Sequence, residues 1–342
     1  MGTSLSQAPS NPKQLRLAIA LGDPAGIGAE VTLKALAQGA ASEQPPLLVG
    51  CRRWLEGQYE MLRQISPEPL VDPAQLEMLD LPLTEPVKPG QGSTGSGHDS
   101  FLWLTAATQA VQKGQCQALV TAPICKASWH AAGHRYPGQT ERLAELAGCA
   151  HASMLFTAKA PGGHWRMNTL LATTHIPLAE VPRQLNGELV QAKLDLLNGF
   201  CRRFTARPHL LVAGLNPHAG EGGQLGLEES QWLEASLASW QRAHPEVRLE
   251  GPLPPDTCWL GAAEAWRSSA PGPNGYLALY HDQGLIPVKL LAFDAAVNTT
   301  LGLPFLRTSP DHGTGFGIAG MGVARALSMA AAIETAGELS RA

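Results

Sequence analysis

Apolar residues along this chain fall into short runs that alternate with longer amphipathic stretches. The short runs consist of Leu, Val, Ile and Ala and stop at Gly, Pro, Asn or Asp, which is typical of buried strands. The longer stretches repeat their apolar positions every three to four residues, as a helix with one buried face does. The predicted strands cover residues 15–21, 45–50, 116–126, 153–158, 169–177, 209–217 and 276–280.

The amphipathic stretches lie between these strands and predict helices. Residues 66–96 are rich in Pro, Gly and polar residues, which predicts a loop with room for one short strand. The last segment, 315–341, is rich in small residues and becomes helical. The other predicted helices cover residues 31–38, 52–64, 96–115, 141–148, 178–204 and 229–243. Alternating strands and helices predict an α/β protein with mainly parallel sheets flanked by helices.

Three of the predicted strands deliver a histidine at or near their ends. These residues are His175, His218 and His281. The carboxyl ends of strands in α/β sheets are where such proteins place their sites. Three imidazoles with one open position are a common ligand set for a catalytic divalent metal. The alternative is that each histidine is a hydrogen-bonded core or loop residue.

The stretch from 276 to 314 carries further polar residues in otherwise apolar sequence. Lys289, Asn298 and Arg307 follow His281, and a polar turn ends the stretch at Asp311–Thr314. Arginine offers a planar fork of donors and lysine a point charge, and both suit a phosphate or a carboxylate. The stretch therefore predicts recognition of an anionic ligand.

A glycine-containing turn follows the first predicted strand. The sequence GDPAGIGAE occupies 22–30 and leads into a helical pattern. A strand, a glycine turn and a helix can offer backbone N–H groups to an anion. The turn is not the GxGxxG dinucleotide fingerprint, because the spacing is wrong and Pro24 interrupts it. The alternative is a tight turn that needs glycine only for positive φ.

Composition narrows the class of protein. The chain has 342 residues, a length at which we expect two domains. Of its residues 44% are hydrophobic, which is enough to form a buried core. A formal net charge of −4 gives no electrostatic case for a nucleic-acid partner or an acidic membrane surface. No apolar run is long enough to span a membrane.

Cysteine usage and the first residues predict a cytoplasmic protein. The six cysteines are scattered without a CxxC pair, which indicates reduced thiols rather than a zinc ribbon or a disulfide framework. Residues 1–14 are polar and contain Pro and Ser, which predicts a disordered leader. They lack the basic and apolar regions of a secretory signal.

Eight short motifs make the sequence recognisable as a whole. In chain order they read GDPAGIGAE, TAPICK, PGQTE, ATTHIPL, GLNPHAGEGG, GPLPPDT, YHDQGLIPVK and NTTLGLPFLRTSPDHGT. Each motif alone is weak, but eight in this order are highly specific. Together they resemble the PdxA family, the 4-hydroxythreonine-4-phosphate dehydrogenases of vitamin B6 biosynthesis, over residues 15–333.

The resemblance implies roles for named residues. It implies that His175, His218 and His281 bind the divalent metal, which could be zinc, cobalt, magnesium or manganese. The implied substrate-binding residues are Gln139, Thr140, Lys289, Asn298 and Arg307. Asp256, Lys126 and Asp282 are expected as neighbours of the site, and His312, Gly313 and Thr314 as contacts of the dinucleotide.

The resemblance also implies the chemistry and the architecture. The expected reaction is oxidation of 4-phosphooxy-L-threonine by NAD or NADP to a 3-oxo acid that loses carbon dioxide. The implied fold is that of the isocitrate and isopropylmalate dehydrogenases, with two domains and a cleft between them. We expect one α/β domain from 15–135 and 295–342 and a second from 136–294. A homodimer with its sites at the interface is also implied, so one histidine could come from the partner chain.

The sequence departs from the family pattern at two positions. Gln139 stands where the family often has histidine, and glutamine keeps a donor and an acceptor but cannot carry charge. Ala29 stands where proline is usual, and the change removes only a preference for the first helical turn. The first departure keeps a second reading open, in which the same chemistry acts on 4-phospho-threonate or 4-phospho-erythronate. A third reading is a non-catalytic metal-binding protein, against which Lys289, Asn298 and Arg307 argue.

Overall fold

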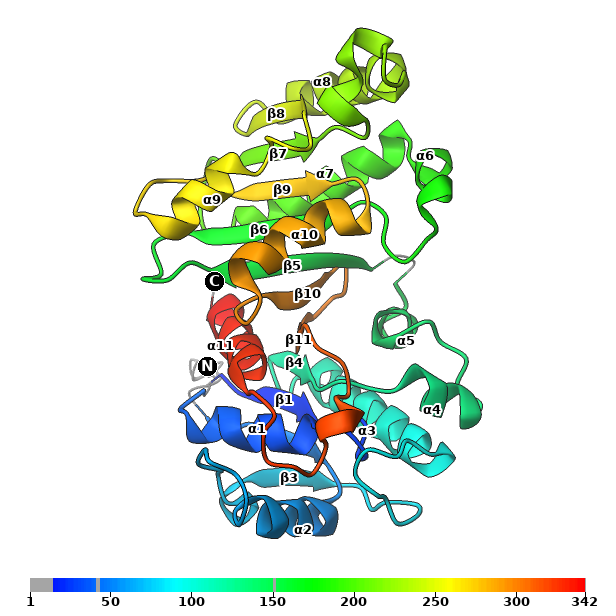
Figure 1. Ribbon diagram of the computed structural model, residues 1–342, viewed down its shortest axis with the longest axis vertical. Helices are drawn as coiled ribbons and strands as arrows, with labels where there is room; N and C mark the ends of the chain where they lie inside the picture. The colour runs from blue at the N-terminus through cyan, green and yellow to red at the C-terminus, as the bar shows by residue number, and fades with distance from the viewer. Residues whose placement is uncertain (1–14, 41–43, 150–151, 342) are drawn as a thin grey trace, which may run out of the picture.

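The structure is a computed structural model, and it describes residues 15–40, 44–149 and 152–341. Its strands form one sheet with the order β3-β2-β1-β4-β11-β10-β5-β6-β9-β7-β8 (Figure 1). The strands are β1 (Leu17–Ala20), β2 (Leu47–Gly50), β3 (Glu77–Asp80), β4 (Ala118–Thr121), β5 (Ser153–Lys159), β6 (Arg166–Leu171), β7 (His209–Ala213), β8 (Arg248–Leu253), β9 (Gly275–Ala278), β10 (Val297–Leu301) and β11 (Leu306–Pro310).

Helices connect these strands and cover both faces of the sheet. They are α1 (Gly28–Ala37), α2 (Arg52–Leu62), α3 (Thr94–Gln112), α4 (Lys126–Ala131), α5 (Gln139–Leu146), α6 (Val181–Gln184), α7 (Gly187–Cys201), α8 (Glu234–Ala243), α9 (Leu260–Arg267), α10 (His281–Ala292) and α11 (Leu327–Arg341). Helix α3 begins with a capping box, because the side chains of Ser93 and Ser96 satisfy each other's backbone N–H groups.

Strand directions confirm the mainly parallel α/β prediction. Seven strand pairings are parallel. The three antiparallel pairings lie together in the middle, where β11, β10, β5 and β6 are neighbours. Strands of both predicted domains therefore belong to one continuous sheet. The division into 15–135 with 295–342 and 136–294 stays a prediction.

The core is arranged in layers around this sheet. At one end, strands β1, β2 and β4 are buried between α3 and the pair α1 and α11, with Leu17, Trp103 and Met329 in one apolar cluster. At the other end, a cluster containing Leu194 packs α7 and α8 against the sheet. A separate cluster containing Leu285 packs α9 and α10 on the opposite face (Figure 1).

Several boundaries differ from the sequence predictions. The predicted strand 116–126 ends at Thr121, and Lys126 instead begins α4. The histidines lie in the loops or helix starts that follow their strands, and His281 is the first residue of α10. Helix α10 was not predicted because it contains Pro287, which normally disfavours a helix interior. Strands β8, β10 and β11 were missed because their sequences mix polar and apolar residues.

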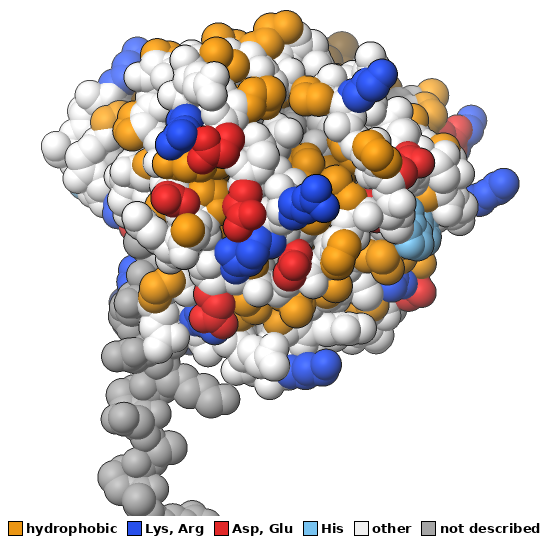
Figure 2. All heavy atoms as spheres, turned by 90° about the horizontal axis from the view of Figure 1, so that it is seen from below, with side chains coloured by type: hydrophobic (Ala, Val, Ile, Leu, Met, Phe, Trp, Pro, Cys, Tyr) orange, Lys and Arg blue, Asp and Glu red, His pale blue; other side chains and the backbone are white. Residues whose placement is uncertain are grey.

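The surface at the α2 and β3 end shows Lys and Arg side chains interspersed with Asp and Glu (Figure 2). Opposite charges also pair locally at the end of α2, where the side chain of Arg63, the residue after the helix, lies 2.8 Å from that of Glu60. Among the described helices, none has both the length and the apolar character needed to cross a bilayer.

Candidate active site

The floor of the candidate site is the antiparallel hairpin of β10 and β11. Asn298 pairs with Ser309 across the hairpin, and Thr300 pairs with Arg307. Because side chains alternate between the two faces of a strand, these four share one face and Thr308 lies on the other. The Thr308 hydroxyl donates a 2.8 Å hydrogen bond to a backbone carbonyl of α11. The hairpin therefore presents Asn298 and Arg307 on the face opposite α11.

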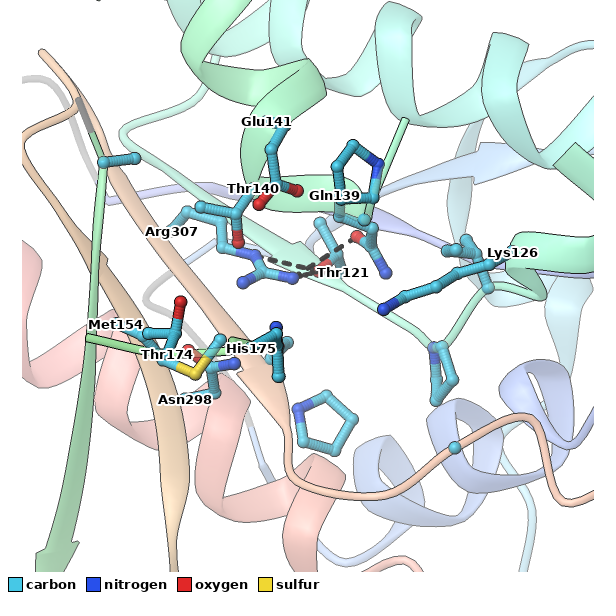
Figure 3. A pocket seen from close by; sticks show the side chains of 18 of the residues that line it. Thr121, Lys126, Gln139, Thr140, Glu141, Met154, Thr174, His175, Asn298 and Arg307 are labelled. Carbon is cyan, nitrogen blue, oxygen red and sulfur yellow. Dashed lines mark hydrogen bonds between the residues drawn. The ribbon is translucent and has the colours of Figure 1, made fainter. Parts of the chain in front are cut away.

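A cavity of about 220 Å³ lies over this floor (Figure 3). Its walls come from the end of β4, the starts of α4, α5 and β5, and the loop after β6. The predicted site residues that line it are Lys126, Gln139, Thr140, His175, Asn298, Arg307, His312 and Gly313. The fold thus collects most of the predicted substrate and cofactor residues in one place.

Arg307 is the most buried charge in this cavity, with 3% of its surface exposed. Its Nε and Nη2 donate to the hydroxyl of Thr121 at 3.1 and 2.7 Å, and its Nη1 donates to Thr300 at 3.1 Å. Burial lowers the pKa of the guanidinium to about 10, and the nearby Glu141 opposes that change. Arg307 is therefore still a cation at neutral pH, and it can attract an anion into the cavity.

Gln139 supports Arg307 rather than standing free in the cavity. It is the first residue of α5, and its Nε2 donates a 3.0 Å hydrogen bond to the carbonyl of Ala122. Its Oε1 accepts a longer, 3.4 Å hydrogen bond from Nη2 of Arg307. The amide therefore joins the end of β4 to the guanidinium, while the neighbouring Thr140 also lines the cavity (Figure 3).

Other charges around the cavity act on His175. The side chain of Lys126 extends into the cavity, and Glu141 lies near Thr140 (Figure 3). Burial lowers the pKa of His175, the neighbouring Lys126 and His281 lower it further, and Glu141 acts in the opposite direction. The His175 imidazole therefore stays neutral to a lower pH than an ordinary histidine, and a neutral ring can ligate a metal.

His175 and His281 lie side by side. Their ring centroids are 5.4 Å apart, and both rings border a second cavity of about 250 Å³. Nδ1 of His281 lies 2.7 Å from a carboxylate oxygen of Asp282, so the ring N–H donates to it. This contact leaves Nε2 of His281 with a lone pair, as in many metal sites where a carboxylate orients the ligand.

His218 does not join this pair. It is exposed in the turn Pro217–Gly223, where its φ of 52° lies in the left-handed region, and it borders neither cavity. Among residues 15–40, 44–149 and 152–341, no three His, Cys, Asp or Glu side chains are grouped closely enough to hold a metal. A single chain thus brings together two of the three predicted ligands.

Other predicted residues lie outside the main cavity. Lys289, on α10, forms a 3.1 Å ion pair with Asp311, so in this chain its charge is already partnered. Asp282 borders the second cavity beside His281. Asp256 is exposed after β8 and lines none of the cavities described.

Of the three residues predicted to contact the dinucleotide, two line the cavity. His312 and Gly313 line it, and Nε2 of His312 is buried without a hydrogen-bond partner in the described part of the chain. Thr314 is absent from the lining, and its carbonyl accepts a 2.9 Å hydrogen bond from the N–H of Ile27. That bond joins this segment to the glycine turn before α1.

Sequence reasoning missed Thr121, Thr300, Ser309 and Glu141. Thr300 and Ser309 alternate with Asn298 and Arg307, so a correctly predicted hairpin would have placed all four on one face. Thr121 begins the TAPICK motif, but the sequence did not show that its hydroxyl meets Arg307, because that contact depends on β11 running beside β4.

Comparison with known proteins agrees with the motif resemblance. A family profile described as "Pyridoxal phosphate biosynthetic protein PdxA" matches residues 42–336. The chain belongs to the PdxA family. The predicted family is therefore confirmed.

The similarity to individual PdxA relatives covers nearly the whole length of this chain. A Synechococcus sp. (strain RCC307) protein named 4-hydroxythreonine-4-phosphate dehydrogenase is 66% identical, covering 95% of this chain and 99% of the relative. A Salmonella typhimurium protein named D-threonate 4-phosphate dehydrogenase is 36% identical, and the match covers 95% of this chain and 98% of that relative. The crystal structure of the 4-hydroxythreonine-4-phosphate dehydrogenase of Klebsiella pneumoniae matches with a TM-score of 0.81 at 36% identity. The match covers 97% of this chain and 100% of that chain. These relatives confirm the predicted dehydrogenase class and fold.

Proposed function

We propose that this PdxA protein oxidises 4-phosphooxy-L-threonine with NAD or NADP. The oxidation gives a 3-oxo acid, which loses carbon dioxide to form 3-amino-2-oxopropyl phosphate on the way to pyridoxine 5'-phosphate. The observation that carries the proposal is the buried Arg307 in a cavity that also contains Lys126 and His175. The 66% identity to a relative named for this substrate supports it.

The cavity offers groups for each part of this substrate. Arg307 and Lys126 are cations and suit the phosphate and the carboxylate. Thr140 and Asn298 can hydrogen-bond the same groups, and the buried Oδ1 of Asn298 has no partner within the described residues. Because these groups come from a strand hairpin and from helix starts, they hold the substrate in one orientation, which favours transfer of a hydride to a nearby nicotinamide.

A divalent metal would fit beside His175 and His281. The adjacent rings, the lowered pKa of His175 and the orienting carboxylate of Asp282 suit a metal that prefers imidazole. Zinc or cobalt fits this donor set better than magnesium, which prefers oxygen ligands. When bound, the metal would lower the pKa of the substrate hydroxyl and stabilise the enolate that forms on loss of carbon dioxide.

We infer a homodimer in which His218 from one copy completes the metal site of the other. His218 is exposed and separate from His175 and His281 within one chain. Helix α10, which His281 begins, and the residue that caps its end expose apolar side chains, with 60% of Ile286, 80% of Leu290 and 59% of Phe293 exposed. An apolar surface of this kind beside an incomplete ligand set suits a second copy of the chain.

The dinucleotide is proposed to bind along the segment 312–314. His312 and Gly313 border the cavity, and the unpartnered Nε2 of His312 can hydrogen-bond a ligand. We retain the proposed domains, 15–135 with 295–342 and 136–294, with the cavity between them. The cytoplasm is the proposed location, because all six cysteines are free thiols.

A phosphorylated sugar acid is the second candidate substrate. The D-threonate 4-phosphate dehydrogenase of Salmonella typhimurium shares 36% identity with this chain. Its named substrate carries a phosphate and a carboxylate, which the same cations could bind. The higher identity to the Synechococcus relative favours the amino acid.

Turnover with a substrate panel tests the proposal. Purified protein is incubated with NAD or NADP and with 4-phosphooxy-L-threonine, 4-phospho-D-threonate or 4-phospho-D-erythronate, with and without chelator. We expect reduced nicotinamide from the amino acid, lost on chelation and restored by added zinc or cobalt. Turnover of a sugar acid alone would replace the substrate, and absence of any turnover with metal added would favour a non-catalytic protein.

A further inference from the structure

Arg307 is a buried cation whose partners are all neutral. It forms no ion pair with an Asp or Glu of the described residues, and its hydrogen bonds go to two threonine hydroxyls and one amide. A buried charge is normally paired, because an unpaired one is costly to remove from water. Glu141 acts on this charge from across the cavity without forming an ion pair with it, so a direct anionic partner for Arg307 would come from a bound ligand.

The hydrogen bonds use most of the donors of the guanidinium. It has five N–H groups. Nε and Nη2 each donate to Thr121, Nη1 donates to Thr300, and Nη2 also contacts Gln139 at 3.4 Å. One N–H of Nη1 has no acceptor among these residues, and the contact to Gln139 is long enough for a ligand to replace it. The guanidinium thus has a fixed plane and few donors available for a ligand.

We propose that Thr121 and Thr300 are positioning residues that orient Arg307 without neutralising it. Hydroxyl oxygens accept hydrogen bonds and carry no net charge, so the full positive charge stays available to one oxyanion of the substrate. A carboxylate at either position would fix the same plane but cancel that charge. This inference rests on the proposed function in one respect, because it requires a substrate that carries a phosphate or a carboxylate.

The positions of the threonines support this role. Thr121 is 1% exposed at the end of β4, and Thr300 is 3% exposed and paired with Arg307 across the hairpin. They approach the guanidinium from opposite sides, one from each neighbouring strand of β11. A purely structural role is the competing explanation, because threonine is common in strands.

Valine and serine substitutions separate the two explanations. Thr121→Val and Thr300→Val keep the shape and remove the acceptor, whereas Thr121→Ser keeps the acceptor. The matched control is Thr308→Val, which removes an equally buried hydroxyl on the opposite face of β11. Each variant is assayed for substrate KM, nicotinamide KM and melting temperature, and binding of inorganic phosphate and of acetate is measured by calorimetry.

We expect each site-facing valine variant to raise the substrate KM roughly 10- to 100-fold, the range for hydrogen bonds to a charged group. The same variants should weaken binding of phosphate or acetate and leave the nicotinamide KM unchanged. Thr121→Ser should stay within a few fold of wild type. Thr308→Val should lower the melting temperature and leave both ligands unaffected.

Thr121→Asp tests the charge argument directly. An aspartate at this position would pair with Arg307, so the fold should be at least as stable as that of Thr121→Val while anion binding is lost. The proposal is overturned if Thr121→Asp keeps its anion affinity, or if both valine variants bind substrate, phosphate and acetate as wild type does. Calorimetry needs no turnover, so a wrong substrate assignment would leave this test intact.

Discussion

The ring centroids of His175 and His281 lie 5.4 Å apart at the second cavity, although more than a hundred residues separate the two histidines in the sequence. The loop after β6 supplies one ring and the first residue of α10 supplies the other. They are adjacent because β6 and β9 are parallel neighbours whose carboxyl ends meet at one edge of the sheet. The third predicted ligand, His218, is exposed and does not border the cavity that His175 and His281 share.

Mixing two inactive variants tests the shared metal site. His218→Ala and His281→Ala should each abolish turnover. When the two are unfolded, mixed and refolded together, about half of the dimers combine one chain of each kind, and one of the two sites in each is intact. We expect about a quarter of the wild-type rate per total protein. A mixture as inactive as its components would contradict a site shared between chains, and near-wild-type activity of either variant alone would remove that histidine from the site.

Arg307→Lys tests the guanidinium. Lysine keeps the charge but loses the planar fork that spans Thr121 and Thr300. We expect a loss of roughly 1.5–3 kcal/mol in kcat/KM, the range for hydrogen bonds to charged groups. Arg325→Lys is the control, because Arg325 is an exposed residue paired with Asp294. An unchanged kcat/KM in the Arg307 variant would exclude it from substrate binding.

Gln139→His tests the main departure from the family pattern. In this chain the amide bonds Ala122 and Arg307, and an imidazole can replace one of these contacts. We expect kcat/KM for 4-phosphooxy-L-threonine to stay within a few fold near neutral pH. A new dependence on pH around the ordinary histidine pKa of about 6.5, together with a changed preference between the amino acid and a sugar acid, would show that the position selects the substrate.

The stability of the protein should fall as the pH falls below about 6.5. Burial lowers the pKa of His134, whose ring stacks on Phe101 with centroids 3.6 Å apart. Above the pKa that the histidine has in the unfolded chain, its ring is neutral in both the folded and the unfolded state, and the protein has its full stability. Below it the unfolded chain takes up a proton first, so stability declines until the folded pKa is passed. The pKa values of His175 and His209 shift in the same direction.

His134→Phe separates this histidine from the other two. Phenylalanine keeps the stacking on Phe101 and does not titrate. Melting temperature measured between acidic and neutral pH should therefore decline less steeply in the variant than in wild type. Identical slopes would show that His134 does not contribute to the pH dependence.

The sequence located most of the buried strands, but it did not show how the candidate site residues are arranged. The apolar runs located β1, β2, β4, β5, β6, β7 and β9, because a buried strand needs a continuous apolar segment. The β10–β11 hairpin was missed because its polar residues face the cavity while it lies in the middle of the sheet. Thr121 could not be predicted, since its role depends on β11 lying beside β4. The separation of His218 from the other histidines likewise depends on tertiary structure.

One measurement tests the central claim most directly. Metal-stripped protein is given 4-phosphooxy-L-threonine and NAD or NADP, zinc or cobalt is then added, and reduced nicotinamide and released carbon dioxide are followed together. The account predicts no reaction before the metal is added, and afterwards one carbon dioxide for each reduced nicotinamide, in step with the appearance of 3-amino-2-oxopropyl phosphate. No reduction of the dinucleotide in the metal-loaded protein, or full activity in the stripped protein, would contradict it.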